Sequence, residues 1–175
     1  DQQGQLLANP VSYRDDRTEG RMEAVFARVP RAEVFSQTGV QFMRINTLYQ
    51  LMSLLQNRSP QLRSADTLLM APDLLNYWLT GARVSEFTIA TTTQMFDPQM
   101  GGWAVKMLDS IGLPTHILPE IVPPGTKLGE YEGIPVTAPA CHDTGSAVAA
   151  VPTRTTDFAY ISSGTWSLVG LEIDT

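Results

Sequence analysis

Apolar residues recur at helical spacing in the first half of the chain. Between residues 46 and 57 they stand three and four positions apart, which predicts an amphipathic core helix with Asn46 as its N-cap (Leu48, Leu51, Met52 and Leu55). A second helix is predicted over residues 73–79, because Pro72 suits a first helical turn and Gly81 suits a helix end. Both helices are expected to pack in a common core.

The pattern changes further along the chain. Residues 85–94 are rich in threonine and are predicted to form a loop with hydroxyls turned inward. Residues 113–129 hold four prolines, which marks a crossing between two domains. Apolar runs over 135–139 and 158–161 then predict strands, with a helix of small residues over 145–150 between them. This alternation indicates an α/β protein.

Composition narrows the possible partners. Twelve basic residues oppose eighteen acidic ones, for a net charge of −6, and the scattered basic residues argue against a nucleic-acid partner. Cys141 is the only cysteine, so no disulfide forms within the chain and the reducing cytoplasm is expected. No apolar run approaches the roughly 18 residues that span a bilayer, so no membrane partner is expected. The chain does not begin with methionine, which suggests a piece of a longer protein.

The first candidate for chemistry is the cluster His142-Asp143-Thr144. It follows a predicted strand and opens a predicted helix, so the Asp143 carboxylate is expected to be partly shielded and held by N–H groups, as suits a general base. The same position suits a helix N-cap, unless Thr144 takes that role. His142 is expected to hydrogen-bond a polar substrate, because His116 and Cys141 add too few ligands for a zinc site. A Ser/His/Asp hydrolase is excluded by the lack of a G-x-S-x-G elbow.

Two polar turns each have two interpretations. Ser162-Ser-Gly-Thr165 lies between hydrophobic runs and can present N–H groups and hydroxyls to a phosphate. It lacks the spacing and the lysine of a P-loop, and a β-hairpin turn explains it equally well. Residues 14–17 (Arg-Asp-Asp-Arg) form either a solvated turn with weak surface pairs or a charged clamp at the edge of a cleft.

Together these motifs resemble the FGGY family of carbohydrate kinases. The chain contains CHDTGSAV at residues 141–148 and YISSGTWSLVG at residues 160–170, and the segments 13–18, 46–51 and 90–94 fall in the family's order. The His-Asp-Thr and Gly-Thr-Trp-Ser versions are similar to those of family members that act on L-rhamnulose. The resemblance covers nearly the whole chain, which makes it more specific than any one motif.

The resemblance implies a partial actin-like, ribonuclease-H-like sugar kinase fold. Residues 1–133 would be the later part of the family's N-terminal domain, and residues 134–175 the start of its C-terminal domain. It also implies a kinase that uses ATP and Mg²⁺ to phosphorylate L-rhamnulose at its primary 1-hydroxyl. Asp143 would be the base, His142 and Thr144 would help to hold the sugar, and Gly164 and Thr165 would contact the ATP phosphates.

Two alternatives stay open. The first is a kinase of the same family for another ketose or polyol, such as L-fuculose or xylulose. The second is a non-catalytic actin-like ATP-binding module, since a fold does not fix a function. The family's N-terminal phosphate loop and its adenosine-binding residues lie outside these residues, so the fragment alone is expected to be inactive.

Overall fold

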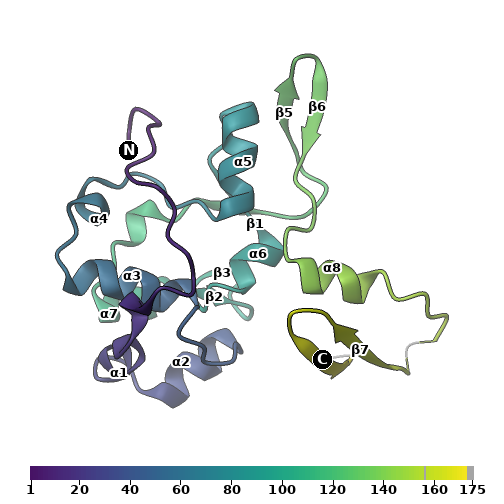
Figure 1. The fold of residues 1–175 in the computed structure, drawn as a ribbon, viewed down its shortest axis with the longest axis horizontal. Helices are drawn as coiled ribbons and strands as arrows, with labels where there is room; N and C mark the ends of the chain where they lie inside the picture. The colour runs from purple at the N-terminus through teal and green to yellow at the C-terminus, as the bar shows by residue number, and fades with distance from the viewer. Residues whose placement is uncertain (156, 173–175) are drawn as a thin grey trace.

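The computed structural model describes residues 1–155 and 157–172. Figure 1 shows a cluster of helices, and beside it two hairpins and a further helix formed by the later part of the chain. The helices are α1 (Arg21–Phe26), α2 (Arg31–Thr38), α3 (Thr47–Gln56), α4 (Pro60–Ser64), α5 (Ala71–Thr80), α6 (Phe87–Thr91), α7 (Val105–Ile111) and α8 (Asp143–Ala149), with short 3-10 turns η1 (Asp16–Thr18) and η2 (Thr115–Ile117). The strands are β1 (Val84–Glu86), β2 (Phe96–Asp97), β3 (Gly102–Trp103), β4 (Glu120–Val122), β5 (Lys127–Tyr131), β6 (Ile134–Thr137), β7 (Ala159–Ser163) and β8 (Ser167–Leu171).

The core lies between α1, α3 and α7. The apolar stripe predicted for residues 46–57 is buried here, with Leu48 and Met52 fully inaccessible to solvent. Met107 and Leu108 of α7 pack into the same cluster. Each such side chain contributes about 1.5–3 kcal/mol by leaving water, so this cluster is the main source of stability for the helical part.

Asn46 differs from its predicted role. It occupies the N-cap position of α3, but its side chain makes no capping hydrogen bond. Its amide instead donates to the Gln41 carbonyl at 3.2 Å and to Gln94 Oε1 at 3.3 Å. Asn46 is buried, and this tertiary network uses the side chain that local capping would need.

Helix α5 forms as predicted. Pro72 lies in its first turn, and Gly81 ends it in the left-handed conformation (φ 77°), where its N–H donates to the Tyr77 carbonyl at 2.7 Å. Strand β1 follows and pairs in parallel with β4, with Ser85 opposite Ile121. Among the described residues, no helix is long and apolar enough to cross a membrane.

The loop predicted over residues 85–94 is wrong, because β1 and α6 occupy it. Helix α6 begins directly after Glu86, whose carboxylate accepts the N–H groups of Thr88 and Ile89 as an N-cap. The hydroxyls of Thr91 and Thr92 donate to carbonyls three residues earlier in the chain. These local bonds allow a threonine-rich segment to form a short helix.

The proline-rich segment 113–129 is structured for much of its length. Leu113, Ile117 and Val122 are buried, and β4 pairs with β1. The chain then forms the β5–β6 hairpin, which stands beside α5 in Figure 1. Helix α8 and the antiparallel β7–β8 hairpin follow, close to the strands and the helix predicted for this part of the chain.

Candidate functional site

The cluster at residues 142–144 lies where the chain leaves β6 and enters α8. His142 is the N-cap residue of α8, without a side-chain capping bond, and Asp143 is the first helical residue. The prediction that Asp143 or Thr144 forms the cap is therefore wrong. The extended backbone of His142 (φ −79°, ψ 105°) places the helix start one residue earlier than a cap at Asp143 requires.

Asp143 is exposed, so the expected shielding of its carboxylate is also wrong. Its Oδ1 accepts the backbone N–H of Thr144 at 2.7 Å and lies 3.5 Å from the Thr144 hydroxyl. Among the described residues, no donor is bonded to Oδ2. The carboxylate is thus held through one oxygen, and the other is available to a substrate.

His142 and Thr144 flank Asp143 and are both half-buried. A Cβ added at Gly145 would lie 3.4 Å from His142 Nδ1, an ordinary contact, so the imidazole covers the first turn of α8. Within residues 1–155 and 157–172, no group of three His, Cys, Asp or Glu side chains is arranged to hold a metal ion. The groups at this site are therefore the Asp143 carboxylate and the polar side chains of His142 and Thr144.

The backbone before Asp143 is held by Glu86, which the sequence patterns did not single out. This fully buried carboxylate accepts Cys141 N–H at 3.0 Å, besides Thr88 N–H, Ile89 N–H and the Thr88 hydroxyl at 2.5 Å. Burial raises the pKa of Glu86, but the hydrogen bonds from Thr88, Cys141 and Ile89 outweigh it and bring the pKa below its ordinary value. Glu86 is therefore a buried anion that its donors stabilise.

Asp73 of α5 is hydrogen-bonded to the backbone of Glu86. It is buried, and it accepts the Ser85 hydroxyl and the Glu86 N–H, both at 3.0 Å. Burial raises the pKa of Asp73, against the hydrogen bonds from Glu86 and Ser85, and the charge of Glu86 raises it further. Hydrogen bonds therefore run from α5 through β1 to the segment that carries Asp143.

Cys141 is a protected thiol. Its S–H donates to the Pro139 carbonyl at 3.3 Å, and burial together with the negative charges of Glu86 and Asp73 raises its pKa to about 11. A thiol that stays protonated is a poor nucleophile and a poor metal ligand. At neutral pH the Cys141 thiol is therefore protonated and weakly nucleophilic.

Gly164 and Thr165 lie in the turn of the β7–β8 hairpin. Ser163 pairs with Ser167, and Gly164 N–H donates to the Trp166 carbonyl at 2.8 Å, so the hairpin interpretation of Ser162–Thr165 is confirmed. Thr165 is exposed, and its side chain makes no hydrogen bond within the described residues. The Thr165 hydroxyl is therefore better placed to meet a phosphate than the Gly164 N–H, which is already bonded.

The hairpin turn borders a cleft of about 660 Å³. Thr165 and Trp166 line it from one side, and Arg14 and Asp15 from the other, together with residues 42–45. Arg17 binds Asp15 at 3.0 Å, and its hydrogen bonds lower the pKa of that carboxyl. The polar turn at residues 14–17 is thus exposed to solvent, and it also lies at the edge of this cleft. The described lining of this cleft includes Thr165 but none of residues 142–144.

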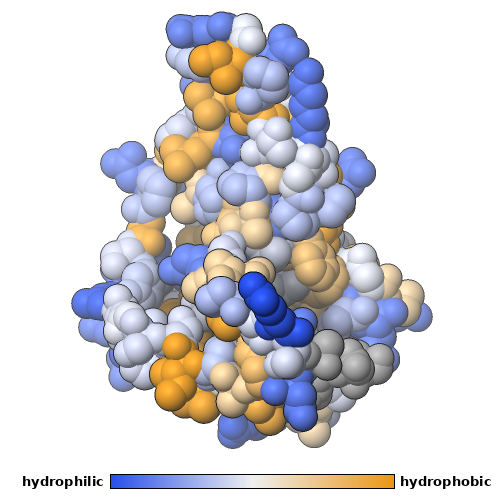
Figure 2. Space-filling model, turned by 90° about the vertical axis from the view of Figure 1, so that its right-hand side faces the viewer, coloured by the Kyte–Doolittle hydropathy of each residue, from blue (hydrophilic) through white to orange (hydrophobic). Residues whose placement is uncertain are grey.

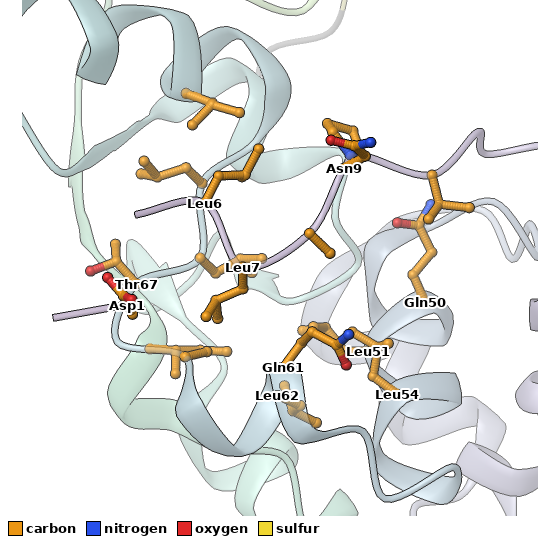
Figure 3. A pocket seen from close by; sticks show the side chains of 18 of the residues that line it. Asp1, Leu6, Leu7, Asn9, Gln50, Leu51, Leu54, Gln61, Leu62 and Thr67 are labelled. Atoms are coloured by element: carbon orange, nitrogen blue, oxygen red, sulfur yellow. The ribbon is translucent and has the colours of Figure 1, made fainter. Parts of the chain in front are cut away.

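A second cavity, of about 580 Å³, lies beneath the N-terminal segment. Figure 3 shows Leu6 and Leu7 of that segment, with Leu51, Leu54 and Leu62 on the other side. Its lining is mainly apolar but includes Asp15 and Arg17 of the polar turn, and among the described residues it contains none of residues 142–144, 164 and 165.

The β7–β8 hairpin leaves large apolar side chains open to solvent. Ile161 and Val169 are 74% and 76% exposed, and Ile134 on β6 is 67% exposed. Figure 2 faces this side of the molecule and shows hydrophobic areas among the hydrophilic ones, both near the top and along the lower edge. Among the described residues, each hairpin is a separate two-stranded sheet, with α5 against the β5–β6 hairpin and α8 against β7.

Comparison with known proteins shows that this chain is similar to carbohydrate kinases. The sequence model of the N-terminal domain of the FGGY family of carbohydrate kinases matches residues 1–143. The chain is 45% identical to the rhamnulokinases of Bacteroides thetaiotaomicron and Pectobacterium carotovorum, over 98% and 100% of its length. It spans only 37% and 36% of those two proteins.

Solved structures agree on the fold. The ligand-bound xylulose kinase from Lactobacillus acidophilus superposes with a TM-score of 0.79 at 17% identity, over 94% of this chain and 36% of that one. A carbohydrate kinase from Novosphingobium aromaticivorans gives a TM-score of 0.79 at 23% identity, over 98% of this chain and 40% of that one. The partial actin-like sugar kinase fold expected from the sequence is confirmed.

Proposed function

This chain belongs to the FGGY family of carbohydrate kinases, and we propose that it forms part of an enzyme that phosphorylates L-rhamnulose. The reaction transfers the γ-phosphoryl group of ATP to the primary 1-hydroxyl and yields L-rhamnulose 1-phosphate and ADP. The observation that carries the proposal is the 45% identity to rhamnulokinases over essentially the whole chain. The His-Asp-Thr cluster and the Gly-Thr-Trp-Ser turn lie within that match.

Asp143 is the proposed general base. Its Oδ1 is held by Thr144 N–H, and Oδ2 is available to accept the proton of the sugar's 1-hydroxyl. The hydroxyl oxygen then bonds to the γ-phosphorus while the bond from that phosphorus to the ADP oxygen breaks. A positioned base of this kind contributes about 10²- to 10⁴-fold in rate. His142 and Thr144 flank Asp143 and hold the sugar hydroxyls.

Thr165 and Gly164 are the proposed contacts to the ATP phosphates. The exposed Thr165 hydroxyl at the tip of the hairpin supports this role. Mg²⁺ commonly binds through nucleotide phosphates with only one or two carboxylates. That mode suits this chain, whose described residues contain no dedicated cluster of ligands. When bound, Mg²⁺ neutralises the charge that builds up on the phosphates.

The remaining features of the proposal concern the whole protein. We place the boundary between the two domains at residues 133 and 134, at the turn of the β5–β6 hairpin. We expect the enzyme to act in the cytoplasm on a small sugar and ATP, without nucleic-acid or membrane partners. The net charge of −6 and the single cysteine support this expectation.

A panel of sugars tests the proposal. The complete reading frame is expressed, and ADP release with MgATP is measured against L-rhamnulose, L-fuculose, xylulose and glycerol. We expect the largest kcat/KM for L-rhamnulose. A larger kcat/KM for another sugar would contradict L-rhamnulose as the substrate but leave the proposed phosphoryl transfer in place. No turnover with any of the sugars would favour a non-catalytic ATP-binding module.

A further inference from the structure

Helix α6 contacts the residue before the candidate base through the side chain of Thr88. Thr88 Oγ1 accepts the backbone N–H of His142 at 3.0 Å, across 54 positions of sequence. The same hydroxyl donates to Glu86 Oε2 at 2.5 Å. Thr88 thus joins the buried anion to the residue that precedes Asp143.

This contact is one of three that hold the backbone before α8. Glu86 Oε2 accepts Cys141 N–H at 3.0 Å, and on the other side the Ser146 hydroxyl donates to the Ala140 carbonyl at 2.8 Å. The amides of residues 141 and 142 precede a helix, where an intrahelical partner is lacking. Glu86 and Thr88 supply these partners, and they fix the backbone one residue before Asp143.

Other hydroxyls nearby do not have this role. Those of Thr91, Thr92 and Thr93 donate to carbonyls three residues earlier, at 2.6–2.7 Å. They serve α6 and the turn after it, whereas Thr88 bonds to a distant segment. Among these threonines, only Thr88 therefore bonds to the backbone that leads into Asp143.

We propose that Thr88, itself held by Glu86, is a positioning residue that sets the place of the Asp143 carboxylate relative to the sugar. The inference rests on the proposed function, because it assigns Asp143 the role of base. Asp143 is exposed, and only one of its oxygens is bonded within the described chain, so its placement depends on the backbone that carries it. A displacement of about 1 Å at a reacting group can cost about 10²-fold in rate.

The test compares Thr88→Val with Thr88→Ser in the complete enzyme. Valine keeps the shape and removes the acceptor, whereas serine keeps the hydroxyl. We expect Thr88→Val to lower kcat by roughly 10- to 100-fold, with KM for ATP changed by less than about 2-fold, and Thr88→Ser to restore kcat to within about 3-fold. Thr92→Val, which removes a hydroxyl bonded only within its own turn, is the matched control and should leave kcat nearly unchanged.

A double-mutant cycle separates this inference from the proposed function. If Thr88 acts through Asp143, then Thr88→Val should lower kcat much less in an Asp143→Asn background than in the wild type. If Asp143→Asn abolishes turnover but Thr88→Val matches Thr92→Val, the positioning role is wrong and the base assignment stands. If Asp143→Asn leaves turnover intact, the base assignment itself is wrong. Equal losses from Thr88→Val in both backgrounds would indicate a merely structural role and overturn the inference.

Discussion

Glu86→Gln removes one negative charge from the buried junction between β1, α6 and the segment before α8. In the wild type, four donors converge on the carboxylate: the N–H groups of Thr88, Ile89 and Cys141 and the Thr88 hydroxyl. A glutamine amide offers a single acceptor oxygen, and its NH₂ group must face at least one of these donors. Hydrogen bonds to a charged group contribute about 1.5–3 kcal/mol each.

We therefore expect Glu86→Gln to lower the free energy of unfolding by about 3 kcal/mol. For a domain of this size, the corresponding fall in the thermal midpoint is roughly 6–12 °C. Circular dichroism melts at pH 7 measure it. The control is Glu130→Gln, whose ion pair with Lys127 at 2.9 Å is solvent-exposed and contributes about 0–1 kcal/mol.

The pH dependence gives a second check with a definite sign. Because the folded pKa of Glu86 lies below its ordinary value, its stabilisation is fully present above an unfolded pKa of about 4.3. It is lost as the pH falls through the lower folded pKa. Asp73 has a raised pKa and titrates with the opposite sign; the part of this rise that comes from the charge of Glu86 is lost in the variant, so Asp73 cancels only in part. The stabilisation that Glu86 adds to the wild type should thus shrink as the pH falls below about 4. A variant as stable as Glu130→Gln at pH 7 would refute this account of Glu86.

Two further predictions concern residues near the candidate site. Cys141, with its pKa raised to about 11, should react with a thiol reagent at pH 8 on the order of 100-fold more slowly than an ordinary cysteine, and a rate equal to that of free cysteine would contradict its burial. Gly170→Ala should destabilise the β7–β8 hairpin by about 1–3 kcal/mol, because the new Cβ would overlap the ring of Tyr160 on the paired strand. Gly164→Ala, which meets open space, is the control in thermal melts, and equal midpoints for the two variants would count against the packing of Tyr160 on Gly170.

The sequence correctly predicted the helices and the hairpin that are determined by residues within or next to them. The buried stripe of α3 follows from apolar spacing, and α5 follows from Pro72 and Gly81, which set its ends without help from distant residues. The β7–β8 hairpin was one of two interpretations of the same turn, and it forms because hydrophobic runs flank a short glycine-containing connection.

Signals that depend on tertiary contacts were missed. Glu86 was not singled out, because its carboxylate acts on amides 55 positions away as well as on its own helix. Asn46 makes no capping bond to α3, and its side-chain amide instead donates to Gln94 Oε1. The Trp103 indole N–H donates to the Pro119 carbonyl at 2.7 Å, a contact that the proline-rich composition of this segment does not reveal.

The exposure of Asp143 could not be predicted from the sequence either. Small residues on the following helix suggested close packing around the carboxylate, and in this chain they leave it open. Its candidacy as a base came from the motif around it. What the structure adds is the means by which its backbone is held.

The most direct test of the central claim is the turnover of Asp143→Asn in the complete enzyme with L-rhamnulose and MgATP. Asparagine keeps the shape and can still accept Thr144 N–H, but it cannot take the proton of the sugar hydroxyl. The account predicts a fall in kcat of about 10²- to 10⁴-fold, with KM for ATP little changed. Asp109→Asn, an exposed carboxylate of α7 bonded to the Thr115 hydroxyl, should keep wild-type turnover. A kcat for Asp143→Asn within about 3-fold of the wild type would contradict the role of Asp143 as the base.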